Sequence, residues 1–252
     1  MSSMKDLDLA LRPRRALLAG AIFCVFAAAA ASMATADEEA PAKKVRTALF
    51  VVAEGVYNSE LMAPYDVLQH TVFHTKPGIE TMTISPDGQA ITTFEGITLQ
   101  PHHSFESAPP LDILVVPSAK NNMDADLENE TLIGWVRETG QKARFVMSLC
   151  DGAFVLAKAG LLDGHAATTF PSDQKRFAEM FPKVDLRINV SFVHDGRMLT
   201  SEGGAKSYDV AMYLVDLLYG EKPTQGIGRG LLIDWPPKPG HSPRYIGDRK
   251  PK

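Results

Sequence analysis

Short apolar runs alternate with amphipathic segments along most of this chain. Residues 45–53, 111–116 and 143–149 are rich in Val, Leu, Ile and Phe, and turn-forming residues lie between them. Continuous apolar runs of this length are typical of strands buried on both faces of a sheet. Alternating positions predict two further strands at 79–84 and 91–100. Helical spacing predicts helices at about 59–72, 129–140, 151–160, 172–180 and 205–219.

The last third of the chain adds a short strand and a hairpin to this pattern. Residues 165–169 are expected to form the strand, and residues 187–194 and 197–201 the hairpin, which turns at Asp195-Gly196. Regular alternation of strands and helices predicts one α/β domain over residues 45–222. Its sheet is doubly wound and mostly parallel, with helices on both faces.

Two segments are expected to lie outside that domain. Residues 37–44 form a polar linker, and residues 223–252 form a C-terminal extension rich in Pro, Gly and Arg. The start of the extension, 226–235, retains enough apolar residues to pack on the domain. Residues 236–252 are predicted to be irregular.

The first 36 residues have the features of a bacterial-type export signal. A basic segment over 1–15 precedes an apolar, Ala-rich segment over 16–31 and a small-x-small site at Ala34-Thr35-Ala36. We therefore expect cleavage after Ala36, a periplasmic or secreted protein, and no stable membrane association afterwards. The Arg14-Arg15 pair suggests twin-arginine export. The alternative is an uncleaved anchor, because 16–36 carries no charge and is long enough to span a bilayer.

Composition excludes several classes of function. The chain has 252 residues and a formal net charge of −4, and no basic patch stands out, so nucleic acid is not an expected partner. Cleavage would remove Cys24 and leave Cys150 without a partner for an intramolecular disulfide. Among the seven histidines, only His70 and His74 have a spacing that places them on one helix face, and no third ligand is near. We expect no metal and no cofactor.

Cys150 is the most informative residue. The apolar run 143–149 ends at this cysteine, and a helical pattern begins directly after it. A strand–turn–helix of this kind exposes a nucleophile at the carboxyl edge of a parallel sheet. The partial positive charge of a helix N-terminus favours the thiolate, so we expect a lowered thiol pKa. The alternative is a buried structural cysteine.

Glu60 is the best candidate for a group that moves protons at that thiol. It begins the helix after the first strand, so it should lie at the same sheet edge as Cys150. Partial burial beside a thiolate would raise the pKa of this carboxyl, allowing it to stay protonated and donate to the sulfur. The alternative is a carboxylate that only stabilises the first turn of its helix.

Three blocks of sequence resemble the ThiJ/PfpI superfamily. They are residues 53–68, residues 150–169 with Cys150-Asp151-Gly152-Ala153, and residues 199–204. The likeness spans about 45–220 and implies a flavodoxin-like, class I glutamine amidotransferase-like fold and a homodimer. It also implies that Glu60, four residues before Pro64, contacts a nucleophilic Cys150. The superfamily includes glyoxalase-like, deglycase, protease and isonitrile hydratase members. It also includes transcription factors, a branch not expected for an exported chain without a helix-turn-helix domain.

The chain departs from the superfamily at both known histidine positions. Phe170 stands where the deglycase branch has histidine, and Asp151 stands where the protease branch has it. A carboxylate beside a thiol raises the thiol pKa, so Asp151 is expected to stabilise its helix or to hydrogen-bond substrate. Residues 117–120 replace a glycine-rich turn. The backbone N–H groups of Ala119 and Asp151 are the expected donors to an oxyanion.

Two functions follow from these residues. In the first, the Cys150 sulfur adds to the electrophilic carbon of a small 2-oxoaldehyde or isonitrile, and Glu60 passes protons, as in a cysteine-dependent hydrolase or lyase. In the second, the protein is a non-enzymatic redox sensor or stress-protective binding protein that uses the oxidisable Cys150. The substitution of Phe170 weakens a deglycase mechanism and leaves oxidation chemistry untouched.

Overall fold

The computed structural model describes residue 45 and residues 47–249. The predicted signal over 1–36 and the predicted linker over 37–44 lie outside the described residues, and both stay predictions. Within the described part of the chain, no helix is both long enough and apolar enough to cross a bilayer.

The centre of the fold is an eight-stranded sheet in the order β12-β10-β11-β7-β6-β1-β2-β5. Every neighbouring pair is parallel except β10 and β11. The three predicted apolar runs form its middle, because strands covered on both faces need continuous apolar sequence. The strands are β1 (Thr47–Val51), β2 (Glu80–Ser85), β5 (His103–Ser104), β6 (Ile113–Val116), β7 (Phe145–Leu149), β10 (Phe192–Asp195), β11 (Met198–Ser201) and β12 (Arg244–Ile246).

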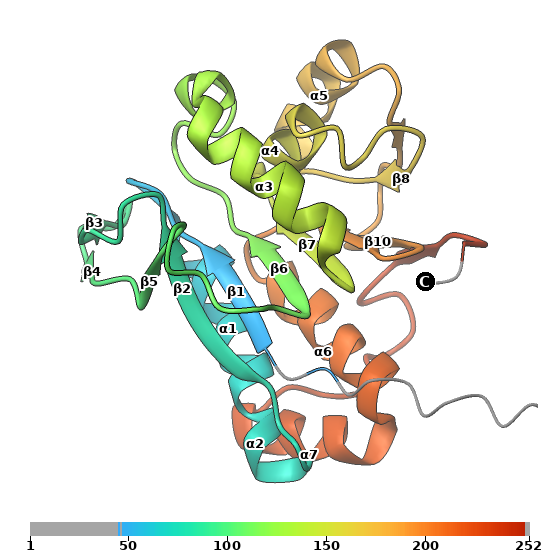
Figure 1. Ribbon diagram of the computed structural model, residues 1–252. Coiled ribbons are helices and arrows are strands. Elements are labelled where there is room, and N and C mark those ends of the chain that lie inside the picture. Colours follow the sequence, from blue (N-terminus) through green and yellow to red (C-terminus); the bar gives the residue numbers. More distant parts are fainter. Residues whose placement is uncertain (1–44, 46, 250–252) are drawn as a thin grey trace, which may run out of the picture. The chain divides into compact units, whose positions relative to one another are not determined.

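Helices cover both faces of the sheet (Figure 1). One face packs against α1 (Asn58–Gln69), α6 (Lys206–Tyr219) and α7 (Glu221–Leu231), with α2 (Thr71–His74) following α1. The other packs against α3 (Glu130–Lys142), α4 (Gly152–Lys158) and α5 (Gln174–Met180), with the short 3-10 helices η1 (Ala125–Glu128) and η2 (Pro171–Asp173). Two hydrophobic cores therefore lie back to back across the sheet. The predicted doubly wound α/β fold is confirmed.

Several local predictions need correction. The expected strand over 91–100 is a hairpin of two short strands, β3 (Ile91–Thr92) and β4 (Thr98–Leu99), because Gly96 takes φ +88° between them. The expected strand at 165–169 shrinks to β8 (Ala166–Ala167), which pairs with β9 (Asp185–Leu186) in a separate small sheet. The predicted hairpin around Asp195-Gly196 is confirmed as β10 and β11, but its first strand begins at Phe192 rather than at residue 187.

The C-terminal extension is more ordered than its composition suggests. Helix α7 buries Ile227 in the first core, and β12 adds a parallel edge strand to β10. Beyond β12, the Arg249 guanidinium donates to Asp195 Oδ2 at 3.0 Å and to the Gly164 carbonyl oxygen at 2.6 Å. The prediction that 236–252 is irregular is therefore wrong for residues 244–246. The pairing with β10 provides the hydrogen bonds that this short segment cannot make alone.

The core on the α4 side provides a direct test of the fold. Phe177 is fully buried and packs edge-on against Phe154, with ring centroids 5.0 Å apart. We expect Phe177→Ala to lower the free energy of unfolding by about 3–5 kcal/mol, because it leaves a cavity that the sheet cannot fill. Phe73→Ala removes the same kind of ring from a side chain that is 73% exposed. It should change the free energy of unfolding by less than about 0.5 kcal/mol. Equal losses in urea unfolding would contradict the described core.

Candidate active site at the carboxyl edge of the sheet

Cys150 lies in the turn between β7 and α4, as the sequence pattern predicts. Its φ is +53°, a left-handed value that residues other than glycine rarely adopt. The backbone N–H donates to the Ser201 carbonyl oxygen at 2.9 Å, which ties the turn to the end of β11. A strained cysteine held by a neighbouring strand is the geometry of a nucleophile elbow. The side chain is 7% exposed.

Two glycines allow the chain to close tightly around this turn. A Cβ on Gly152 would lie 2.0 Å from the Val116 carbonyl oxygen, and a Cβ on Gly203 would lie 2.4 Å from Cys150 Cβ. Neither position accepts a side chain without backbone movement. The glycines thus bring the loops after β6, β7 and β11 together at one point of the sheet edge.

Glu60 comes to the same place from the first turn of α1. It is buried, its Oε1 accepts the Gly204 N–H at 2.8 Å, and its Oε2 accepts the Ser59 hydroxyl at 2.5 Å. Its charge also acts on Cys150 and Asp151, raising the pKa of both groups. The structure therefore brings Glu60 and Cys150 together, and the hydrogen bonds of the Glu60 carboxylate go to Gly204 and Ser59.

Asp151 turns toward the sulfur and away from its own helix. It occupies the position before α4 yet makes no capping hydrogen bond. Its Oδ2 accepts the Cys150 S–H at 3.5 Å, and its Oδ1 accepts the Thr169 hydroxyl at 3.0 Å. Burial, followed by the charge of Asp173, raises the pKa of Asp151 to about 6. The side chain of Asp151 therefore bonds the thiol and Thr169 rather than a backbone N–H of α4.

The environment of the thiol differs from the sequence expectation. Burial is the largest effect that raises the pKa of Cys150, and the nearby charge of Asp151 raises it further. The nearby Ser118 hydroxyl and the Asp151 backbone N–H act in the opposite direction, and their effects are weaker. Ser118 Oγ is buried and completes no hydrogen bond. The resting site therefore holds a neutral thiol, and the expected lowering of its pKa by the helix N-terminus is corrected.

The two remaining predicted residues lie beside this cluster. The Ala119 N–H, an expected oxyanion donor, already donates to Asn122 Oδ1 at 2.8 Å. The Asp151 N–H faces the sulfur. Phe170 directly follows Thr169 and is 40% exposed, so its ring is open to solvent.

Sequence reasoning missed Tyr57 as a residue of this site. Burial raises the pKa of the Tyr57 hydroxyl, and so do the charges of Cys150 and Asp151, so the phenol lies within electrostatic range of the thiol. Its ring packs on Phe94 from the β3–β4 hairpin, with centroids 4.6 Å apart. Glu95 in the same hairpin accepts the Asn58 N–H at 3.1 Å. The available signal was the position of Tyr57 between the first strand and the helix of Glu60.

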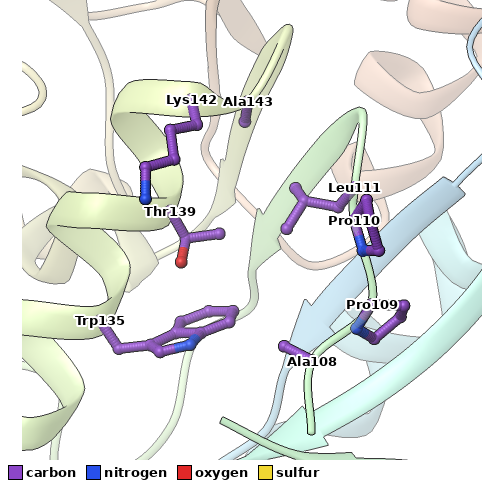
Figure 2. A pocket seen from close by; sticks show the side chains of 8 residues that line it. All are labelled: Ala108, Pro109, Pro110, Leu111, Trp135, Thr139, Lys142 and Ala143. Carbon is purple, nitrogen blue, oxygen red and sulfur yellow. The ribbon is translucent and has the colours of Figure 1, made fainter. Parts of the chain in front are cut away.

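A separate cavity of about 390 Å³ lies at the opposite edge of the sheet (Figure 2). Pro109 and Pro110 line it just before β6, and Lys142 lines it just before β7. These are the amino ends of β6 and β7, and Cys150 follows the carboxyl end of β7. In Figure 2 the Trp135 ring forms one wall and the two prolines the other. This cavity is therefore distinct from the Cys150 site.

Within residues 45 and 47–249, no group of three or more His, Cys, Asp or Glu side chains is arranged to hold a metal ion.

Comparison with known proteins identifies the family. The sequence profile of the DJ-1/PfpI family matches residues 46–217. The chain belongs to the DJ-1/PfpI family. It is 29% identical over 191 residues to an isonitrile hydratase of Pseudomonas putida, covering 75% of this chain and 78% of the relative. It is 25% identical to the protein dj-1beta of Drosophila melanogaster, covering 75% of this chain and 97% of the relative.

Solved structures agree on the fold. The crystal structure of Drosophila melanogaster DJ-1beta superposes with a TM-score of 0.66 at 22% identity, covering 76% of this chain and all of the other. A ThiJ/PfpI family protein from Pseudomonas syringae gives a TM-score of 0.68 at 20% identity, covering 82% of each chain. The resemblance inferred from the three sequence blocks is therefore confirmed at the level of family and fold.

The glycine pair at 203–204 tests the tight closure of the site. Gly203→Ala should destabilise the protein by at least about 2 kcal/mol, because the new Cβ meets Cys150 and the backbone takes φ +86°. Gly204→Ala should cost about 1 kcal/mol, because φ is +54° and no atom lies within 4 Å of the new Cβ. Thermal unfolding of the two variants measures the difference. Equal losses would contradict the close approach at Gly203.

The raised pKa of Asp151 predicts a dependence of stability on pH. Folding moves this pKa upward from 3.8 to about 6, so the native state binds the proton more tightly than the unfolded chain. The associated stability is present below about pH 4 and is lost as the pH rises through about 6, on the order of 2–3 kcal/mol. Asp151→Asn cannot show this loss.

Urea unfolding at about pH 4 and pH 8 measures the effect. Relative to the unchanged protein, Asp151→Asn should gain stability between the two pH values, on the order of 2–3 kcal/mol. Asp87→Asn removes an exposed carboxylate and serves as the control. An equal stability difference for Asp151→Asn at both pH values would show that burial does not act on this carboxyl as described.

Proposed function

We propose that this protein is a cysteine-dependent enzyme that adds water to the electrophilic carbon of a small molecule. The supporting observation is the cluster at the sheet edge. A cysteine at φ +53° bonds Asp151 from its own turn and lies within electrostatic range of Glu60 from α1 and Tyr57 from the loop after β1. A strained, closely packed turn places the sulfur accurately, which is what a nucleophile requires.

An isonitrile is the substrate class that we favour. The support is the 29% identity to the Pseudomonas putida isonitrile hydratase over three quarters of both chains. The chemistry also fits the site, because an isonitrile carbon accepts a sulfur nucleophile and then a proton. The site offers several acidic groups to supply that proton and shows no histidine beside the thiol in the described residues. The aldehyde carbon of a 2-oxoaldehyde is the second substrate class.

The residues divide the work in this proposal. The Cys150 sulfur attacks the carbon, and the Asp151 N–H that faces it stabilises developing negative charge. Glu60 accepts the Gly204 N–H through Oε1, which fixes its carboxyl beside the thiol for proton transfer. Because the Ala119 N–H is bonded to Asn122, it serves as a second donor only if that amide side chain rotates away.

Redox sensing is the weaker candidate for the same cysteine. Oxidation to a sulfenic acid proceeds from the thiolate, and selectivity follows thiolate character and exposure. Burial and the charge of Asp151 both raise the pKa of Cys150, and the side chain is 7% exposed. These properties disfavour a peroxide sensor and are compatible with an enzyme that removes the thiol proton during attack.

Export and dimerisation complete the proposal. We infer from residues 1–36 that the protein acts in the periplasm or outside the cell, and from the family resemblance that it works as a homodimer. N-terminal sequencing of the protein recovered from the host tests the first inference, since a start at Met1 would exclude cleavage.

Turnover of a small aliphatic isonitrile to the corresponding formamide tests the proposed function. Cys150→Ser should lose activity by at least about 10³-fold, and Glu60→Gln by about 10²–10⁴-fold, because each removes a reacting group. Glu80→Gln alters an exposed acid in β2 and should retain full activity. Methylglyoxal assayed in parallel decides between the two substrate classes. Equal rates for the unchanged protein and Cys150→Ser on both substrates would end the proposal.

A further inference from the structure

We propose that Asp151 is the proton acceptor for Cys150: its carboxylate takes the thiol proton as the sulfur attacks and then delivers it to the substrate. The identity of the electrophile rests on the function proposed above. The proton transfer itself rests on the geometry of this chain. It assigns to Asp151 a role different from the helix stabilisation or substrate binding that the sequence suggests.

The orientation of the Asp151 side chain is the first support. An aspartate before a helix ordinarily accepts a backbone N–H of the first turn, since its oxygen is well placed to do so. Asp151 makes no such bond. One oxygen meets the Cys150 sulfur at 3.5 Å, and the other is held by the Thr169 hydroxyl at 3.0 Å. One oxygen of the carboxylate therefore faces the thiol proton, while the Thr169 hydroxyl holds the other oxygen in place.

The surrounding charges are the second support. The titratable groups that act on Asp151 or on the thiol from the packed elements are all acids: Cys150 at the elbow, Glu60 in α1, Asp173 in η2 and Tyr57 before α1. Two adjacent negative charges in a buried site are costly. A thiolate beside an ionised Asp151 would create such a pair. Transfer of the proton to Asp151 keeps one negative charge on the pair at every stage.

The third support is that no histidine bonds the thiol among the residues that the structure describes. Phe170 occupies the position where the deglycase branch of the superfamily has histidine. The two nearest histidines along the chain make hydrogen bonds to other residues. His165 Nδ1 lies 3.1 Å from Asp195 Oδ2, and His194 bonds the Tyr213 hydroxyl and the Gly196 carbonyl oxygen. Asp151 is the carboxylate that bonds the sulfur directly.

The reaction with an isonitrile, R–N≡C, balances in two stages. The S–H bond breaks as the S–C bond forms, the proton passes to Asp151, and Asp151 returns it to the carbon to give a thioimidate, R–N=CH–S–Cys150. Water then adds to that carbon and the C–S bond breaks. Glu60 relays one proton of the water to nitrogen, and the other returns to the sulfur. The product is a formamide, R–NH–CHO, and nothing is oxidised or reduced.

Alkylation of Cys150 by iodoacetamide tests the proton transfer without any substrate. An internal acceptor creates a fixed small fraction of thiolate paired with protonated Asp151, and that fraction does not change with pH once Asp151 is ionised. The alkylation rate should therefore be flat between about pH 7 and 9 and fall as the pH drops through about 6. In Asp151→Asn the plateau should vanish, leaving a tenfold rise in rate per pH unit.

Two further variants control for charge and folding. Asp173→Asn removes a neighbouring charge that raises the pKa of Asp151, so the plateau should persist with its lower edge at a lower pH. Thr169→Val removes the hydroxyl that lowers this pKa, so that edge should move to a higher pH. Thr169→Val also keeps the test decisive if Asp151→Asn does not fold.

Isonitrile turnover separates this proposal from the proposed function. Asp151→Asn should lower kcat by about 10²–10⁴-fold. The fall in kcat that is expected for the unchanged protein below about pH 6 should disappear in this variant. A flat alkylation profile without isonitrile turnover would reject the substrate and retain the proton transfer. Two results would overturn the role of Asp151. One is an alkylation rate of the unchanged protein that rises tenfold per pH unit from about pH 6 to 9, and the other is a plateau that survives in Asp151→Asn.

Discussion

The candidate site is governed by the cost of placing two negative charges side by side where water is excluded. Cys150 and Asp151 are adjacent in sequence, both are buried, and their side chains contact each other. Glu60 adds a third acid from α1, and its carboxylate is held by the Gly204 N–H. Because no basic group offsets these acids in the described site, the thiol stays protonated at rest. The proton must therefore move within the cluster during attack.

The fold itself brings these acidic side chains together. The turns after β1, β6, β7 and β11 all reach the same edge of the parallel sheet, where doubly wound folds bind their ligands. Gly203 and Gly152 allow the turns to touch, and the left-handed backbone of Cys150 projects its side chain into their midst. The DJ-1/PfpI fold supplies the elbow, and the residue after the cysteine decides how its proton is handled.

The fold could be predicted from the sequence because its signals are local. Runs 45–53, 111–116 and 143–149 are apolar throughout, which specifies central parallel strands, and the cysteine terminates the last of them. Strand β12 escaped prediction because Arg244-Tyr245-Ile246 is short and half polar, and becomes a strand only by pairing with β10. Edge strands of this kind depend on tertiary partners rather than on propensity.

The chemistry of the site was harder to predict from the sequence, because it also depends on tertiary contacts. The strand–turn–helix pattern located Cys150, and the likeness to a family located Glu60. The direction of the thiol pKa depends on burial and on which way Asp151 points, and neither is encoded in spacing. Thr169 and Asp173 act on Asp151 from a segment far along the chain, so their contribution becomes visible only in the folded protein.

Ultraviolet difference spectroscopy of the thiolate measures the resting protonation state of Cys150 most directly. The spectrum of Cys150→Ser is subtracted from that of the unchanged protein across a pH titration, so that the remaining absorbance reports this sulfur alone. The account predicts only a small, constant thiolate absorbance between about pH 6 and 9, because burial and the charge of Asp151 keep the proton mainly on the sulfur. A full thiolate signal at neutral pH would contradict it.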